Sequence, residues 1–429
     1  MISFEPNIIV IDDKYDEVSG IVEYYQSNGS GCKFFNADIV EGDNMPHKNY
    51  SDVNLVFLDL YLEGEKFDAE QCSNWVKSMI PEKAFYLLVI WSKDPSEMRE
   101  VVDNLVKENR LPFIVLCENK TEYPSINDEK YNFEELFKKL NHIFDNIPAL
   151  DEISIWKRNI KTSSNQVIGN LAKTSDPSIF NNKLKKIIIS HGGSSVKTNI
   201  NNNRKRSILF DALDNVLISN SNKNNFEDEI SELNNQQLYS LENPEESAID
   251  KELNSWFHFK FNNENLDGQI LPGIIAYNNH SLFKKLYSIQ DDPKFERILT
   301  KQKEENIIIQ DIVLVLSRPC DIAQNKYGKN IKLLSGIILK SAFRKTNTKK
   351  EIHFNESLPD SSKKYEHLFF NEDENDITLI FDFRYSFSVP EKIFKEKFKN
   401  IKIFNKELLS EMQVEYSSYS SRLGITQII

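Results

Sequence analysis

Short apolar runs alternate with segments of helical periodicity along the first third of the chain. The runs cover residues 7–11, 32–35, 53–58, 85–91 and 111–117. Several are apolar without interruption, which is typical of strands buried on both faces of a parallel sheet. Helical spacing follows in residues 14–27, 68–79 and 133–144, and Asp94 and Pro95 mark the start of another helix. Strands that alternate with helices predict a doubly wound α/β domain with five parallel strands.

The hydrophobic pattern changes after about residue 148. Helical spacing continues to about residue 252, with Asn- and Ser-rich breaks between the segments, so we expect a helical middle region. Strand-like patterns follow at residues 256–261, 271–277, 307–317, 332–339 and 377–387, and a last helix is expected from 406 to about 419. These patterns predict a C-terminal α+β domain, built on a small curved sheet or barrel.

The predicted architecture is therefore multi-domain. The first domain covers residues 1–124, and its last helix, about 131–147, leads into the linker. Residues 148–252 form the helical middle region, and residues 253–429 form the C-terminal domain. A chain of this length is long enough for several separate cores.

Composition and charge narrow the functional classes. A formal net charge of −12 disfavours a general nucleic-acid binder, because phosphate contacts need clustered Lys and Arg. The sequence has no apolar stretch of about twenty residues and no secretory pattern at its start, so we expect no membrane span. Its four cysteines include no CxxC pair, which suits a reducing compartment and disfavours a zinc site. We therefore expect a cytoplasmic protein with no membrane partner and no clear nucleic-acid binding.

Acidic residues follow two of the predicted strands at their carboxyl ends. Asp12 and Asp13 follow the first strand, and Asp59 follows the third. Open α/β sheets place their ligand crevice at this edge, so three carboxylates converge there if the two strands are neighbours. Such a cluster repels itself unless a hard cation lies among the oxygens, and Mg²⁺ is the usual one. The alternative is that the three acids cap the helices that follow them.

The arrangement of these residues resembles a response-regulator receiver domain. The resemblance rests on the alternating strands and helices, on Asp12-Asp13 after strand one, on Asp59 after strand three and on Ser92 after strand four. It covers about the first third of the chain. It implies that Asp59 accepts a phosphoryl group from a histidine kinase, with Asp12, Asp13, Asp59 and the main-chain carbonyl of Tyr61 holding Mg²⁺.

The resemblance gives two further residues a role. Ser92 is expected to hydrogen-bond the phosphoryl oxygens and to report modification through the loop after strand four. Receivers also carry Lys followed by Pro at the end of strand five, whereas here Lys120 lies late and Thr121 follows it. Either the loop bends Lys120 back into the pocket or the Lys role is vacant. The loop after Asp59 also lacks the Pro that is common in the family.

The segment that follows the strongest apolar run of the C-terminal domain suggests a second centre. Cys320 and Asp321 lie in the sequence Ser-Arg-Pro-Cys-Asp directly after that run. A nucleophilic Cys needs a base, and His353 and His367 are the nearby histidines. The alternative is a buried thiol, with Asp321 fixing the turn by side-chain hydrogen bonds.

Two classes of function follow. The first is a signalling adaptor in which the receiver passes its phosphorylation state to the C-terminal output domain. Large receivers of this kind occur beside histidine-kinase-like ATPases in bacterial phage-defence operons, so the resemblance implies such an ATPase, or another operon-encoded protein, as partner. A homodimer through the receiver or the helical region is also expected. The second is an effector enzyme centred on Cys320 and Asp321 and regulated by a degenerate receiver, and a scaffolding subunit is compatible with the same observations.

Overall fold

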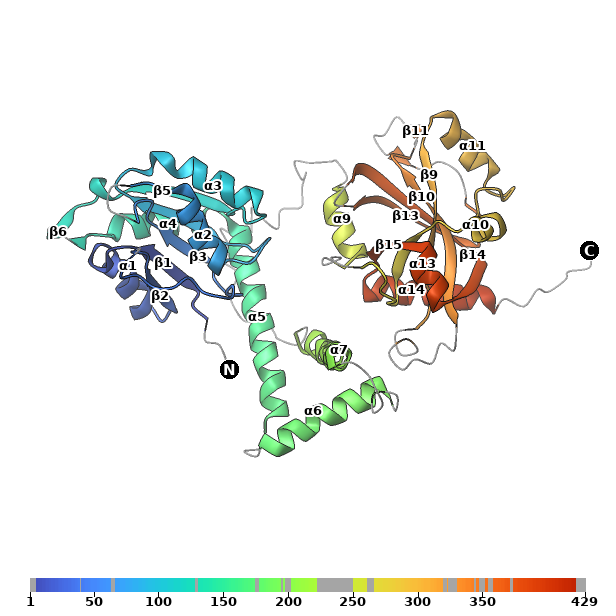
Figure 1. Ribbon diagram of the computed structural model, residues 1–429, viewed down its shortest axis with the longest axis horizontal. Helices are drawn as coiled ribbons and strands as arrows, with labels where there is room; N and C mark the ends of the chain where they lie inside the picture. The colour runs from blue at the N-terminus through green and yellow to red at the C-terminus, as the bar shows by residue number, and fades with distance from the viewer. Residues whose placement is uncertain are drawn as a thin grey trace, which may run out of the picture. The chain divides into compact units, whose positions relative to one another are not determined.

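The computed structural model describes residues 5–38, 40–62, 66–127, 130–173, 177–193, 196, 202–221, 250–260, 266–318, 322, 330–342, 345–346, 352–353, 358–370 and 373–421. These residues divide into two compact units. The first contains the described residues up to Ile153, and the second contains those from Ser154 onward. Figure 1 shows the elements of both units.

The core of the first unit is a five-stranded sheet in which every neighbouring pair is parallel. The strands lie in the order β2-β1-β3-β4-β5. Their bounds are β1 (Ile8–Asp12), β2 (Cys32–Asn36), β3 (Leu55–Leu58), β4 (Leu87–Ser92) and β5 (Ile114–Asn119). The predicted doubly wound sheet is therefore confirmed. Because β1 lies next to β3, the residues that follow these two strands meet at one edge of the sheet.

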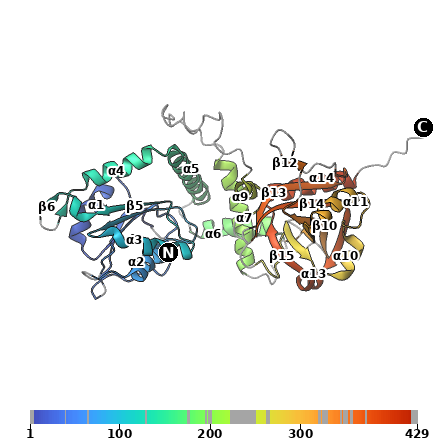
Figure 2. The same ribbon diagram turned by 90° about the horizontal axis from the view of Figure 1, so that it is seen from above.

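Helices cover both faces of this sheet, as Figure 2 shows. They are α1 (Tyr15–Ser27), α2 (Ala69–Met79), α3 (Met98–Lys107) and α4 (Glu134–Asp145). Successive side chains of a strand point to opposite faces. Ile9 and Ile11 pack in the cluster that contains α2 and α3, whereas Ile8 and Val10 pack in the cluster that contains α1 and α4. The continuous apolar runs are thus explained by burial on both sides.

Side-chain caps fix the starts of the helices on one face. The Asp68 carboxylate accepts hydrogen bonds from the backbone N–H groups of Glu70 and Gln71 at the start of α2. Asp94 accepts from the Ser96 N–H at the start of the short 3₁₀ helix η1 (Pro95–Glu97), which leads into α3. Both caps satisfy N–H groups that have no partner inside the helix.

The first unit departs from the sequence prediction in three places. No helix occurs among the described residues between β2 and β3, where the hydrophobic pattern is also poor, so strands and helices do not alternate there. A small hairpin of β6 (Ser125–Asn127) and β7 (Lys130–Tyr131) precedes α4. Finally, β5 begins and ends later than the predicted residues 111–117, and this shift changes the position of Lys120.

Helices follow the first sheet, as the periodicity predicted. They are α5 (Pro148–Leu171), α6 (Pro177–Gly192) and α7 (Asn202–Ser221). The compact units divide the chain inside α5, so the described helical residues from Ser154 onward belong to the second unit. A separate middle domain that ends near residue 252 stays a prediction.

The second unit contains a six-stranded sheet in which every pairing is antiparallel. The order is β13-β14-β10-β9-β8-β15. The strands are β8 (Ile274–Asn278), β9 (Ile308–Val315), β10 (Asn330–Lys340), β13 (Ser362–Phe370), β14 (Asp373–Pro390) and β15 (Phe398–Ile403). Its described helices after α7 are α9 (Lys251–His258), α10 (Ser281–Tyr287), α11 (Glu296–Glu304), α13 (Glu391–Lys397) and α14 (Lys406–Ser420). The predicted α+β class is confirmed.

This sheet is strongly curved. β13 and β15 lie at opposite ends of the strand order, yet the rings of Tyr365 in β13 and Phe404, directly after β15, are only 5.5 Å apart. Both rings belong to one hydrophobic cluster with residues of β8, β9, β10 and α14. The two edges of the sheet therefore bend toward each other around a shared core.

The strand predicted over residues 256–261 is wrong in its first half. Residues 256–258 lie in the helix α9, Phe259 follows it and forms an isolated antiparallel bridge with Phe404, and residue 261 lies outside the described residues. The Asp250 carboxylate accepts a hydrogen bond from the Leu253 N–H and so caps this helix. Trp256 and Phe257 are more than half exposed, so their alternation does not reflect a buried sheet face.

None of the helices in the described part of the chain combines the length and apolar character that a bilayer crossing requires.

Candidate phosphoryl and metal site

Three carboxylates meet at the carboxyl edge of the parallel sheet. Asp12 is the last residue of β1, Asp13 follows it, and Asp59 follows β3. One oxygen of each carboxylate lies within 4.8 Å of the others. Asp12 and Asp59 are buried, whereas Asp13 is partly buried. Because β1 and β3 are neighbours, the three carboxylates form the acidic cluster that the sequence predicted.

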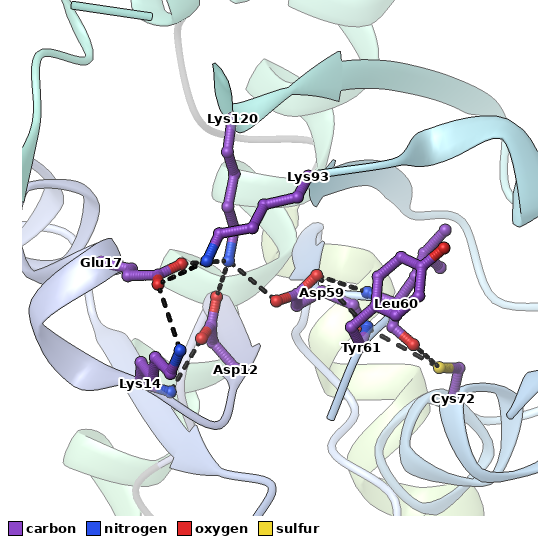
Figure 3. A network of polar contacts seen from close by, with 9 residues as sticks. All are labelled: Asp12, Lys14, Glu17, Asp59, Leu60, Tyr61, Cys72, Lys93 and Lys120. Atoms are coloured by element: carbon purple, nitrogen blue, oxygen red, sulfur yellow. Dashed lines mark hydrogen bonds and ion pairs between the residues drawn. The ribbon is translucent and has the colours of Figure 1, made fainter. Parts of the chain in front are cut away.

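The turn after β3 holds the Asp59 carboxylate in a defined orientation. Its Oδ1 accepts hydrogen bonds from the backbone N–H groups of Leu60, at 2.7 Å, and Tyr61, at 3.4 Å. The Leu60 carbonyl in turn accepts from the Cys72 thiol of α2 at 3.3 Å. These contacts leave the other carboxylate oxygen directed toward the centre of the site (Figure 3).

The ammonium group of Lys120 lies at the centre of the cluster. Its Nζ is 2.7 Å from Asp12 Oδ2, 2.8 Å from Asp59 Oδ2 and 3.0 Å from Glu17 Oε2. The side chain is fully buried. Lys120 reaches the pocket because β5 extends to Asn119, whose side chain accepts from the Thr121 N–H and caps the short 3₁₀ helix η2 (Lys120–Glu122). Of the two alternatives for Lys120, the structure therefore supports the one in which it occupies the pocket.

Sequence reasoning missed Glu17 and two of the three lysines that pair with it. Glu17 lies in the first turn of α1, and its Oε1 is 3.3 Å from Lys93 Nζ and 3.6 Å from Lys14 Nζ. Figure 3 shows all three lysine side chains directed toward this carboxylate. The available signals were the position of Glu17 four residues after Asp13 and that of Lys93 directly after Ser92. Neither could be interpreted before the sheet order was known.

Burial and the opposing charges shift the protonation equilibria of the site. Burial raises the pKa of Asp12 to about 7, with Lys120 opposing the shift and Asp59 adding to it. Burial and the neighbouring Asp59 also raise the pKa of Asp13. For Lys120, burial favours the neutral amine, but the contacts with Asp12 and Asp59 outweigh it and raise the pKa, so this side chain stays charged. Burial opposes ionisation of Glu17 too, yet the ion pairs with Lys120 and Lys93 lower its pKa.

Ser92 ends β4 with a hydroxyl that has no hydrogen-bond partner among the described residues. The side chain is fully buried. β4 pairs with β3, so Ser92 and Asp59 lie at the same edge of the sheet on adjacent strands. A buried hydroxyl without a partner is costly and is uncommon in folded proteins. Its position suits a donor whose acceptor arrives with a ligand.

The donor set fits a hard divalent cation. Carboxylate and carbonyl oxygens are the ligands that Mg²⁺ takes in proteins, and each carboxylate keeps free lone pairs after its present hydrogen bonds. Asp12, Asp13 and Asp59 would supply the carboxylates, and the ligand role of the Tyr61 carbonyl stays a prediction. The fit has one condition: the cation and Lys120 must share the oxygens of Asp12 and Asp59.

The second candidate centre is the one predicted around Cys320 and Asp321. Cys320 and Asp321 lie outside the described residues. His367, one of the two histidines considered as a base for Cys320, pairs through Nδ1 with Asp376 Oδ2 at 2.8 Å. A nucleophilic role for Cys320 therefore stays a prediction.

Comparison with known proteins adds no relative. No family description matches the chain, no curated protein sequence matches it, and no solved structure matches it. The observations that bear on function are thus the parallel, flavodoxin-like sheet and the cluster of Asp12, Asp13 and Asp59 at its carboxyl edge, which are compatible with a receiver domain.

Proposed function

We propose that the first unit is a receiver that accepts a phosphoryl group on Asp59 in a Mg²⁺-dependent reaction. The observation that carries the proposal is the buried contact of Lys120 with both Asp59 and Asp12. A cation at this position neutralises charge that develops on a phosphoryl group, and phosphoryl transfer depends on positioning and charge neutralisation more than on covalent help from the protein. The structural alternative, that the acids only cap helices, does not account for a buried lysine shared among them.

The chemistry of the acceptor is simple. An Asp59 carboxylate oxygen attacks phosphorus in a phosphohistidine of the donor, and the bond between phosphorus and the imidazole nitrogen breaks. The electron pair of that bond stays on the imidazole, which regains a proton, and Asp59 becomes an acyl phosphate. Lys120 and the Ser92 hydroxyl would each donate a hydrogen bond to phosphoryl oxygens. A bound Mg²⁺ would supply charge neutralisation and orientation between the carboxylates and the phosphoryl group.

The second unit is the candidate output of this switch. Its curved sheet has a core of its own, so it could bind or act as an independent module. A partner histidine-kinase-like ATPase, a role in phage defence, a cytoplasmic location and a homodimer through the receiver or the helices all stay predictions that rest on the resemblance. An effector centre at Cys320 and Asp321 and a scaffolding role stay alternatives.

The direct test is covalent modification with a small phosphodonor. The full chain is incubated with acetyl phosphate and Mg²⁺, and intact mass is measured before and after. We expect one phosphoryl adduct that requires Mg²⁺, is lost on treatment with hydroxylamine, and is absent in Asp59→Asn.

Asp16→Asn is the matched control, because Asp16 is an exposed aspartate in the first turn of α1, close in sequence to the site. Asp16→Asn should accept a phosphoryl group as the wild-type protein does. If the wild-type protein forms no adduct, or if an adduct still forms in Asp59→Asn, the proposal is contradicted.

A further inference from the structure

A second lysine lies at the opening of the acidic site. Lys93 directly follows Ser92, its side chain is 54% exposed, and its Nζ donates to Glu17 Oε1 at 3.3 Å. Lys93 starts at the end of β4, the neighbour of the strand that Asp59 follows, and Figure 3 shows its side chain extending to Glu17, which Lys120 also contacts. The residue is thus anchored on one side of the site and paired on the other.

The first lysine has no hydrogen-bonding capacity left. An ammonium group has three N–H donors. Lys120 Nζ lies within hydrogen-bond distance of three carboxylates, those of Asp12, Asp59 and Glu17. A phosphoryl group on Asp59 brings additional acceptor oxygens and additional negative charge, and Lys120 can meet them only by giving up one of these partners.

Lys93 can change its partner at lower cost. An ion pair whose lysine is half exposed contributes little, because water competes for both charges. A hydrogen bond from an ammonium group to a phosphoryl oxygen is among the stronger polar contacts. Burial favours the protonated form of Glu17, but its ion pairs with Lys120 and Lys93 outweigh burial and lower its pKa. This carboxylate is therefore charged at neutral pH and competes for both lysines.

We propose that Lys93 is a second phosphoryl-binding cation of this site, and that Glu17 holds it beside Lys120 until a phosphoryl group on Asp59 replaces Glu17 as its partner. The inference rests on the proposed function of Asp59. In this proposal, Lys93 stabilises the phosphorylated state and Glu17 stabilises the unphosphorylated state. The two residues therefore have opposite effects on binding of a phosphoryl group.

Beryllium fluoride tests the proposal, because it binds acceptor carboxylates as a mimic of a phosphoryl group. The full chain is titrated with beryllium fluoride at saturating Mg²⁺ in a calorimeter. Lys93→Gln, which removes one charge–oxygen contact, should weaken binding about threefold to tenfold. Lys107→Gln, an exposed lysine in the last turn of α3, is the control and should bind within about twofold of the unmodified protein.

The role of Glu17 is tested by a double-mutant cycle. Glu17→Gln keeps the shape of the side chain but releases Lys93, so it should tighten binding about twofold to fivefold. In the Lys93→Gln background the same substitution should give no gain. A gain that persists there would show that Glu17 acts through Lys120 or by general repulsion and not through Lys93, and it would overturn the proposal.

The failure of this proposal differs from a failure of the proposed function. If Lys93→Gln binds beryllium fluoride as tightly as the wild-type protein, the proposed role of Lys93 is wrong. The role of Asp59 as acceptor is not affected by that result. A protein that shows neither a phosphoryl adduct nor beryllium fluoride binding overturns both.

Discussion

At the scale of single residues, Lys120 determines the charge balance of the site. A fully buried ammonium group is unfavourable unless its partners compensate for the lost hydration. Asp12, Asp59 and Glu17 provide that compensation at 2.7 to 3.0 Å. The same contacts hold these three carboxylates close together around one ammonium group. Lys120 therefore has a structural role in the unmodified protein in addition to the role proposed in phosphoryl transfer.

Replacement of Lys120 by methionine should reveal this structural role. Lys120→Met leaves Asp12 and Asp59 without their cation, so we expect a loss of about 3–5 kcal/mol in the free energy of unfolding of the first unit. Urea unfolding with and without Mg²⁺ measures it, and Mg²⁺ should recover more stability in the variant than in the unmodified protein. Lys107→Met is the control and should unfold within about 0.5 kcal/mol of the unmodified protein. A variant as stable as that control would contradict the assignment.

Ser92 should separate stability from binding. Its buried hydroxyl has no partner among the described residues, so Ser92→Ala removes an unsatisfied group and should leave the unfolding free energy unchanged or raise it by up to about 1 kcal/mol. The same substitution removes a proposed donor to the phosphoryl oxygens and should slow phosphorylation by acetyl phosphate about tenfold to a hundredfold. Urea unfolding and the rate of adduct formation are the two measurements. A loss of stability together with an unchanged rate would show that the hydroxyl is a structural group.

At the scale of elements, α1 links the site to the packing of the first unit. Its first turn carries Glu17, and one turn later Gly20 lies against the ring of Phe133. A Cβ on Gly20 would be 2.7 Å from Phe133 Cδ2. That ring is buried and packs on Trp91, at 5.1 Å between ring centroids, so it has little room to move. The glycine allows the helix to approach closely enough for Glu17 to reach Lys120.

Two helical glycines should therefore respond in opposite directions to alanine. Gly20→Ala gains helix propensity of about 1 kcal/mol but meets the Phe133 ring, and overpacking costs about 1–3 kcal/mol, so we expect net destabilisation. At Gly169 in α5, a Cβ would meet no atom within 4 Å among the described residues outside its own helix, so Gly169→Ala should stabilise by about 0.5–1 kcal/mol. Thermal unfolding measured by calorimetry compares the two. A stabilising Gly20→Ala would mean that α1 can move away from Phe133 freely.

At the scale of the molecule, the two compact units have separate cores and different sheet types. The proposed cation site lies wholly in the first unit, so a ligand that binds there stabilises that unit through linkage. The units need not unfold together, and a single transition temperature is then not a property of the whole chain.

Magnesium should accordingly act on only one calorimetric transition. At about a hundredfold excess over its dissociation constant, Mg²⁺ should stabilise the first unit by about 2.7 kcal/mol and leave the transition of the second unit unchanged. Asp59→Asn should lose most of this effect, because it removes one carboxylate ligand. An equal shift of both transitions would show that the cation acts elsewhere or that the units unfold as one.

The sequence determined the elements whose signals are local. Buried strands on both faces require continuous apolar runs, and those runs located β1, β3 and β4 to within two residues. The capping residue Asp94 located the start of a helix, because its side chain binds a nearby N–H group. Residues 256–261 show where local patterns fail. Over so short a segment, an alternating strand and a capped, exposed helix have a similar order of apolar residues.

The tertiary structure alone decided which side chains share the site. The sequence placed Asp12, Asp13 and Asp59 at the ends of strands, but only the order β2-β1-β3-β4-β5 brings those ends together. The position of Lys120 depended on the later end of β5, which includes Glu118 and Asn119, whereas the apolar Leu111 lies before the strand and is exposed. Local propensity cannot specify this end, because Glu118 is buried through its contacts with Tyr123 and Lys139. Glu17 and Lys93 joined the cluster for the same reason: contacts between residues far apart in the chain depend on how the elements pack, and no single segment encodes that packing.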